Sequence, residues 1–160
     1  MDYLWTPWRY QYIAGQGKPD RCIFCVAAES ADDRAHLVVH RGTHAYVILN
    51  RFPYTSGHLM IVPHAHVATM ADLRDESLVE LIRLARDAER HLRAVYRPEG
   101  LNLGMNLGES AGAGIAGHLH LHALPRWTGD TNFMTVVGET RVLPEDLDVT
   151  WRRLREAWVA

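Results

Sequence analysis

The longest regular pattern of hydrophobic and polar positions runs from about Asp72 to Arg97. Apolar residues recur there at spacings of three and four, and arginines and acidic residues fill the other positions, as in an amphipathic helix. Asp72 and Asp75 provide an acidic start, and Pro98 provides a stop. The apolar positions are Leu78, Leu81, Ile82, Ala85, Ala88, Leu92 and Val95. We therefore predict one long helix whose charged face is a solvated surface.

Shorter apolar segments on both sides of this helix predict β-strands. The first two are joined by the turn sequence Arg41-Gly42-Thr43, and the third ends at Pro63. The predicted strands are residues 36–40, 45–49, 58–63, 101–106 and 135–138. Residues 144–158 have helical spacing, with Pro144 at the start. This order of elements favours an α+β fold with a mostly antiparallel sheet, one long helix and a C-terminal helix.

The segment that begins at His118 alternates histidine with leucine. On a β-strand, His118, His120 and His122 would share one face, and the leucines between them would enter a core. The imidazoles would stand roughly 6–7 Å apart along a line of about 13 Å, a length that matches a short polyphosphate. Pro125 would end or edge the strand, and Arg126 offers a guanidinium to phosphate or carboxylate. Residue types alone leave phosphate chemistry, a three-histidine metal site and a chance surface strand open.

Four glycines precede the histidines and predict a loop around an anion. Gly108, Gly112, Gly114 and Gly117 leave backbone amides free to approach phosphate closely. A mobile loop without a ligand is the alternative. The position directly before the histidines favours the phosphate-holding loop.

Composition narrows the class of protein. The chain has 160 residues and a formal net charge of −2, with 17 Lys and Arg against 19 Asp and Glu. This size fits one domain over residues 1–160, and the charge argues against broad nucleic-acid binding. No apolar run approaches the roughly 18 residues of a membrane span, and no signal segment opens the chain, so we expect a cytoplasmic protein. Ten histidines are many for this length.

The beginning of the chain carries two further features. Residues 1–21 form an arm that we expect to pack on its own core or on a partner subunit, with direct contact to a base as the alternative. Its aromatic residues include Trp5, Trp8, Tyr10 and Tyr12. Cys22 and Cys25, spaced Cys-x-x-Cys, favour half of a zinc site over a redox pair or two free cysteines.

The histidine segment with its following Pro-Arg resembles the signature of the histidine triad family of nucleotidyl hydrolases and transferases. Two more segments resemble bacterial members that act as phosphorylases or hydrolases of diadenosine tetraphosphate. They are Leu-Trp-Thr-Pro-Trp-Arg at residues 4–9 and Gly-Asp-Thr-Asn-Phe-Met at residues 129–134. The likeness covers about residues 4–150. It implies a histidine-triad fold, commonly a homodimer whose two sheets join, or a higher homo-oligomer.

The resemblance also implies roles for individual residues. His120 would attack the α-phosphate, and His122 would hold the phosphate or the leaving oxygen on the catalytic strand that His118 begins. The expected substrate-binding residues are Asn50 at the ribose, His58 beside the site, Asn106, and the amides of Gly112, Ala113 and Gly114. Many relatives carry Gln-Ser or Gln-Thr where this chain has Gly114 and Ile115. Backbone N–H groups would therefore replace a side-chain hydrogen bond.

The same resemblance completes the metal site. Relatives with Cys-x-x-Cys add the first triad histidine and a histidine after the Gly-His strand. The implied ligands here are Cys22, Cys25, His66 and His118, with His64 as the rival for the third position. Two sulfurs and two nitrogens form a closed tetrahedral set, which predicts a structural zinc.

These observations predict a nucleotidyl hydrolase or transferase that cleaves dinucleoside polyphosphates, with diadenosine tetraphosphate as the expected substrate. Phosphorolysis and hydrolysis both remain open, and a nucleotidyl-histidine intermediate would be formed in either case. One alternative is a hydrolase of nucleoside phosphoramidates or adenylyl conjugates. An alternative of another class is a non-catalytic, zinc-stabilised nucleotide-binding module. The expected partner is a nucleotide, with no nucleic acid and no membrane.

Overall fold

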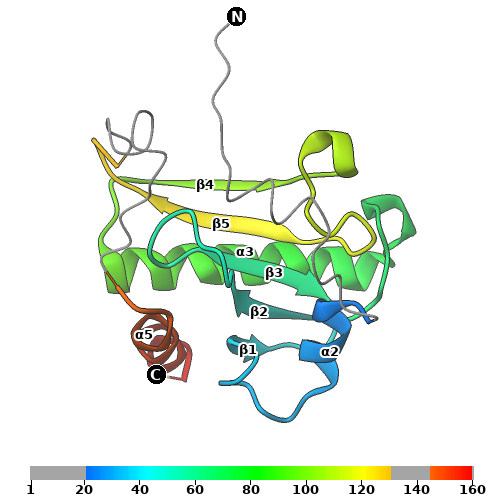
Figure 1. The fold of residues 1–160 in the computed structure, drawn as a ribbon, viewed down its shortest axis with the longest axis horizontal. Helices are drawn as coiled ribbons and strands as arrows, with labels where there is room; N and C mark the ends of the chain where they lie inside the picture. Colours follow the sequence, from blue (N-terminus) through cyan, green and yellow to red (C-terminus); the bar gives the residue numbers. More distant parts are fainter. Residues whose placement is uncertain (1–20, 131–144, 160) are drawn as a thin grey trace, which may run out of the picture.

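A five-stranded antiparallel sheet forms the centre of the computed structural model, which describes residues 21–130 and 145–159 (Figure 1). The strands lie in the order β1-β2-β3-β5-β4. The strands are β1 (Val38–Arg41), β2 (Ala45–Leu49), β3 (Leu59–Pro63), β4 (Gly100–Met105) and β5 (Leu121–Arg126). The helices are α2 (Ile23–Glu29), α3 (Asp75–Tyr96) and α5 (Leu147–Val159), with short 3-10 turns at Met70–Asp72 and Glu109–Ala111. The predicted α+β class is confirmed.

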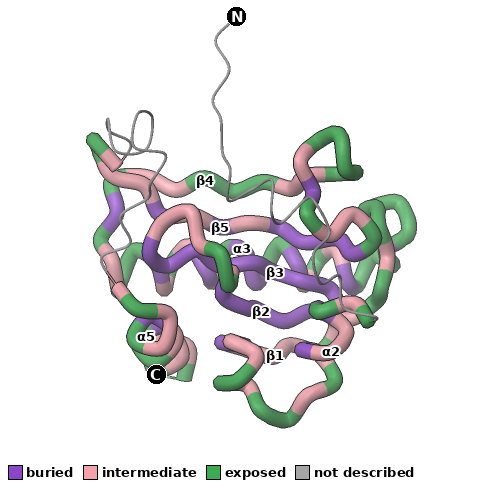
Figure 2. Tube along the Cα trace, in the orientation of Figure 1, coloured by how far each residue is buried: buried purple, intermediate pink, exposed green. Residues whose placement is uncertain are grey.

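Two apolar cores lie on opposite faces of the sheet. Alternate residues of β2 and β3 enter one core with α3, and the residues between them enter the other core with α2. Tyr46 and Ile48, for example, face α2, whereas Val47 faces α3. Both strands are therefore buried on both faces (Figure 2), which explains why their sequences are uninterrupted apolar runs.

The long helix is confirmed with slightly shorter bounds than the predicted residues 72–97. It ends where Arg97 adopts a left-handed conformation, with φ 48°, and donates its N–H to the carbonyl of Arg93. The C-terminal helix is confirmed as α5, which packs against α3 and β1. Pro144, the predicted strand at residues 135–138 and residues 1–20 of the aromatic arm lie outside the described residues.

The prediction that all three triad histidines lie on one strand is wrong. β5 begins only at Leu121, so His118 and His120 precede it, and only His122 belongs to the strand. The ladder between β3 and β5 ends at the pair Ile61 and Leu121. In this register Val62 would next face His120 and Pro63 would face Leu119, and Pro63 has no N–H to donate. The chain bends instead, and Leu119 donates its N–H to the carbonyl of Val67 at 2.7 Å.

Other strand boundaries also differ from the sequence prediction, and β3 and β4 are each displaced by only one residue. β1 starts at Val38 rather than at residue 36, because Leu37 has a φ of 61° and belongs to the preceding turn. β5 continues through Pro125 to Arg126. Pro125 pairs with Leu101 of β4 but lies beyond the last β3 partner, so its missing N–H costs no hydrogen bond to β3.

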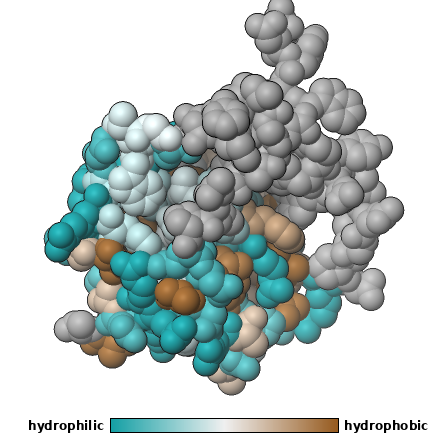
Figure 3. All heavy atoms as spheres, turned by 60° about the vertical axis from the view of Figure 1, so that its left-hand side comes forward, coloured by the Kyte–Doolittle hydropathy of each residue, from teal (hydrophilic) through white to brown (hydrophobic). Residues whose placement is uncertain are grey.

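The surface on the side of α5 is mostly hydrophilic, with apolar residues in small separate groups (Figure 3). Within the described ranges, no helix combines the length and the apolar character needed to cross a membrane. The triad histidines converge on the sheet face that carries α2, so the candidate site lies on that face.

Candidate active site and metal centre

His122 lies in the middle of the sheet, on the face opposite α3. It pairs with Met60 of β3 on one side and with Gly104 of β4 on the other. Directly paired residues of an antiparallel sheet point to the same face, so His122 stands in the same cross-strand row as Met60, which packs in the α2 core. The imidazole is half-buried rather than on an open surface strand.

His58, immediately before β3, determines which nitrogen of His122 carries a proton. The backbone N–H of Tyr54 donates to His58 Nδ1 at 3.2 Å, and Asn50 Nδ2 lies 3.4 Å from the same nitrogen. His58 Nδ1 is therefore an acceptor, and the proton of the neutral ring is on Nε2. His58 Nε2 lies 2.9 Å from His122 Nδ1 and donates to it. His122 consequently carries its own proton on Nε2.

His120 has the opposite tautomer. Its Nδ1 lies 2.8 Å from the carbonyl oxygen of His118, which can only accept, so Nδ1 carries the proton. The unshared electron pair is then on Nε2. The centroids of the His120 and His122 rings are 4.9 Å apart, nearly edge to face. A nucleophilic nitrogen and a donating N–H thus belong to adjacent rings.

Burial keeps these imidazoles neutral. It lowers the pKa of His122 to about 4, with a smaller contribution from neighbouring His120. Burial also lowers the pKa of His120, although the hydrogen bond to the carbonyl of His118 opposes that shift. A neutral imidazole is the form that can attack phosphorus. The site therefore holds its nucleophile in the reactive state at neutral pH.

A second cluster lies beside the first and consists of Cys22, Cys25, His66 and His118, whose ligand atoms all lie within 4.8 Å of one another. His118 Nδ1 is 3.4 Å from Cys22 Sγ, 3.6 Å from Cys25 Sγ and 3.2 Å from His66 Nδ1. His66 Nδ1 is 3.3 Å from Cys25 Sγ. Tetrahedral zinc, with sulfur at about 2.3 Å and nitrogen at about 2.0–2.1 Å, separates its ligands by roughly 3.3–3.8 Å. The four side chains are therefore compatible with zinc.

The hydrogen bonds around the cluster support the same donor set. His118 Nε2 lies 2.9 Å from the carbonyl of Pro63 and donates to it, which leaves Nδ1 unprotonated and directed at the sulfurs. His64, the alternative third ligand, places its Nε2 3.1 Å from the carbonyl of Gly42 and stacks on Tyr46. His64 is not part of the cluster.

Helix α2 connects the two clusters, a feature that the sequence analysis missed. Cys22 caps its N-terminus, and Phe24 places its ring 5.4 Å from the ring of His118 and 5.1 Å from that of His120. Arg41 anchors the other end by donating to the carbonyls of Ala27, Ala28 and Ser30. The signal available in the sequence was the aromatic residue between the two cysteines.

The other predicted substrate-binding residues lie around the same face, with one correction. Asn50 follows β2 and accepts the N–H of Phe52 at 2.9 Å, and Asn106 follows β4. The loop amides of Gly112 and Ala113 are not free, because they donate to the carbonyls of Glu109 and Gly108. The positive φ angles of Gly108 and Gly112 fold the loop back onto itself.

Gly114 is the remaining loop amide. It lies in the turn that leads to His118, and no acceptor for its N–H is found among the described residues. Arg126, expected to meet phosphate or carboxylate, forms a two-pronged ion pair with Asp130 at 2.5 and 2.8 Å.

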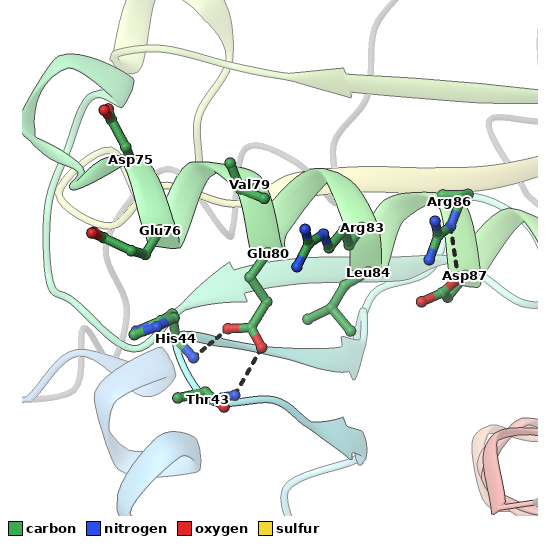
Figure 4. Close-up of a pocket in the computed structure, with 10 residues that line it drawn as sticks. All are labelled: Thr43, His44, Asp75, Glu76, Val79, Glu80, Arg83, Leu84, Arg86 and Asp87. Atoms are coloured by element: carbon green, nitrogen blue, oxygen red, sulfur yellow. Dashed lines mark hydrogen bonds and ion pairs between the residues drawn. The ribbon is translucent and has the colours of Figure 1, made fainter.

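A surface depression of about 610 Å³ lies elsewhere, along α3 (Figure 4). There, Glu80 accepts the backbone N–H groups of Thr43, His44 and Ala45 in the turn between β1 and β2. Burial alone would raise the pKa of Glu80, but these donors hold it below its usual value. The depression is therefore the place where a helix side chain fixes a hairpin, far from the histidine chemistry.

Comparisons with known proteins give a consistent result. The family model described as "HIT domain" matches residues 32–129. A protein of Mycobacterium tuberculosis strain H37Rv named "AP-4-A phosphorylase" is 42% identical over 165 residues, covering 99% of this chain and 85% of that protein. "Protein hit" of Bacillus subtilis is 29% identical over 117 residues, covering 73% of this chain and 79% of that protein.

Solved structures have the same fold. A Zn-bound histidine triad family protein from Mycobacterium smegmatis aligns with a TM-score of 0.69 at 26% identity, covering 86% of this chain and 93% of that one. A hypothetical histidine triad nucleotide-binding protein from Sulfolobus tokodaii aligns with a TM-score of 0.68 at 25% identity, covering 85% and 91%. The family resemblance and the fold expected from the sequence are both confirmed.

The lowered pKa of His122 predicts a specific dependence of stability on pH. Between the unfolded value of about 6.5 and the folded value of about 4, the unfolded chain binds more protons at this residue, so stability falls as pH is lowered. Urea unfolding at several pH values measures the free energy of unfolding as a function of pH. Between pH 4 and 6.5 this free energy should rise less steeply with pH in His122→Asn than in the unsubstituted chain. The difference is at most one proton, about 1.4 kcal/mol per pH unit. Parallel curves would contradict the assignment.

Proposed function

The chain belongs to the HIT-domain family, and on that premise we propose that it is a nucleotidyl transferase that cleaves dinucleoside polyphosphates through a nucleotidyl-His120 intermediate. The observation that carries the proposal is the pair of opposite tautomers: an unprotonated Nε2 on His120 beside a protonated Nε2 on His122. Diadenosine tetraphosphate is the proposed substrate, and the name of the relative at 42% identity supports it.

In the first step, His120 Nε2 attacks the α-phosphorus and forms a P–N bond while the bond to the bridging oxygen breaks. The proton stays on His120 Nδ1, and its hydrogen bond to the carbonyl oxygen of His118 holds the ring in place and supports the positive charge that develops on the ring. His122 donates its Nε2–H to an oxygen of the reacting phosphate. In the second step, an acceptor attacks the phosphorus and releases His120.

The neutral state of His122 favours a polyphosphate as the leaving group. A neutral imidazole can donate a hydrogen bond but is a very weak acid, and the pKa of His122 is lowered to about 4. A polyphosphate can leave as an anion, whereas the amine of a phosphoramidate needs a proton before it departs. Because of this difference between the leaving groups, nucleoside phosphoramidates and adenylyl conjugates are the second candidate substrates.

We assign the binding contacts around this centre as follows. Asn50, beside His58, contacts the ribose, as expected from the sequence. Asn106 and the N–H of Gly114 stabilise the negative charge on the non-bridging oxygens. Gly114 replaces Gly112 and Ala113 in this role, because the amides of those two residues already have partners within the loop.

Phosphate is the proposed acceptor of the nucleotidyl group, and the purified chain should therefore convert diadenosine tetraphosphate to ADP and ATP only when inorganic phosphate is present. His120→Ala should lose nearly all turnover, by at least about 10³-fold, because the attacking atom is removed. Product analysis by anion-exchange chromatography measures both results. His91→Ala is the matched control, since His91 lies on α3, behind the sheet.

AMP and ATP in the absence of phosphate would make water the acceptor. No turnover of any nucleotide would contradict the enzyme and favour the nucleotide-binding module. Substantial activity in His120→Ala would contradict the covalent intermediate even if the products are as proposed.

We further propose that Cys22, Cys25, His66 and His118 hold a structural zinc. The zinc-bound state of the Mycobacterium smegmatis relative supports this assignment, as does the spacing of the four donors. Bound zinc would contribute cross-linking between α2 and the segment before β5. His118 would then be held by its ring on one side and would present its carbonyl to His120 on the other.

Elemental analysis of the purified chain should find about one zinc per chain, and both Cys22→Ser and His66→Ala should lower zinc content and thermal stability together. His64→Ala is the matched control, because its neighbouring imidazole is outside the cluster and its loss should leave zinc content unchanged. A zinc-free chain with full stability, or equal zinc loss in all three variants, would reject the site.

A homodimer joined through β4 is the proposed assembly. β4 is one of the two outer strands of the described sheet, and β1 is the other (Figure 1). Its residue Leu103 is 49% exposed, while its neighbours on the same face, Leu101 and Met105, pack into the core. Sedimentation should give a mass of twice 18.2 kDa. Leu103→Arg should shift it to the monomer, and Val149→Arg on exposed α5 should not.

A further inference from the structure

We propose that the leaving half of the dinucleotide crosses β4 at Gly104, and that Gly104 is the residue that admits long polyphosphate leaving groups. This inference rests on the proposed function and extends it to Gly104, on the face of β4 beside His122. The ligand proposed at this position is a nucleoside polyphosphate chain rather than a single phosphate.

The order of strands gives the direction of the substrate. The ribose contact, Asn50, follows β2, and the reacting phosphate lies at His122 on β5. β3 separates those two strands, and β4 follows β5 on the far side. Neighbouring strands are about 4.8 Å apart, so the path from ribose to phosphorus spans roughly 10 Å across the sheet. The chain of phosphates continues beyond the reacting phosphorus, and the next strand on the side away from the ribose is β4.

Gly104 occupies the point where that path reaches β4. It is the direct cross-strand partner of His122 and is exposed. A Cβ built at Gly104 would have no described atom within 4 Å, so packing does not require glycine here. Nor does the backbone, since Gly104 is not among the glycines with a positive φ. The missing side chain leaves open the space beside the His122 imidazole.

Two asparagines flank Gly104 at a spacing of two residues, and this spacing directs the side chain of Asn102 to the same face of β4. Asn102 is paired with Leu124, one step along the same face of β5. Arg126 donates to Asn102 Oδ1 at 2.7 Å, which fixes the amide so that its NH₂ group is turned away from the guanidinium as a donor. Asn106 stands at the other end, next to the reacting phosphate.

The local charge explains why amide groups, rather than cations, would bind the polyphosphate oxygens here. The positive charge of Arg126 is compensated by Asp130, so this strip has little net charge of its own. Phosphate oxygens accept hydrogen bonds from side-chain and backbone N–H groups without needing a cation. A polyphosphate chain therefore fits a strip that offers donors around a gap, and a short leaving group does not extend far enough to use it.

The test compares Gly104→Val with Gly100→Val, the same substitution on the same strand and face. Gly100 also has open space around its Cβ, and it lies about 13 Å along the strand, opposite Arg126. Isothermal titration measures the affinity for AMP and for a methylene-bridged, non-cleavable analogue of diadenosine tetraphosphate. In Gly104→Val, the ratio of analogue affinity to AMP affinity should fall by at least about tenfold. Gly100→Val should keep the wild-type ratio.

A second variant separates the two parts of the proposal. Asn102→Ala should lower the same ratio by a smaller factor of about three to ten, because one donor is lost but the gap remains. Thermal unfolding and sedimentation of each variant establish that the chain folds and assembles normally.

The inference is overturned if Gly104→Val retains the wild-type ratio, or if AMP and the analogue weaken equally. It is also overturned if Gly100→Val lowers the ratio as strongly. The proposed function fails on a different result, namely that the wild-type chain neither binds nor cleaves diadenosine tetraphosphate.

Discussion

The arrangement of the site depends on His118, three of whose polar atoms connect it to separate parts of the site. Its Nε2–H donates to the carbonyl of Pro63, its Nδ1 faces the cysteine sulfurs, and its carbonyl accepts the Nδ1–H of His120. The imidazole is completely buried, so these directions cannot be exchanged for contacts with water. A metal-ligand geometry and the tautomer of the proposed nucleophile are therefore determined by the same residue. A displacement of His118 would change both at once.

Desolvation has two consequences on this face of the sheet. It keeps His120 neutral, which a nucleophile needs, and it also keeps His122 neutral, which prevents His122 from acting as a strong acid. The same burial that would prepare the proposed attack would thus favour leaving groups that depart without a full proton transfer. Polyphosphates meet that condition, so the pKa values and the proposed substrate class are linked by one physical cause.

The sequence was most informative where one local pattern was sufficient. Apolar spacing identified α3 and α5, and the uninterrupted apolar runs of β2 and β3 identified two strands. Cys22 and Cys25 were named from their spacing, His66 and His118 were added from the family resemblance, and the structure brings these four side chains together. Contacts between distant segments were not accessible in this way. No local pattern indicates that Pro63 ends the ladder before His120, or that Glu80 fixes the turn at Thr43.

The tautomers were also beyond sequence reasoning, because they depend on atoms contributed by distant parts of the chain. His58 is 64 positions from His122, and the Tyr54 N–H that orients it comes from an irregular turn. Once these contacts are known, the order of strands relates positions across the sheet to successive parts of the proposed ligand. The proposed ribose contact, reacting phosphate and leaving group fall on β2, β5 and β4, so the position of a residue across the sheet indicates which part of the proposed substrate it would meet. This relation gives Gly104 a role that neither its conformation nor its packing explains.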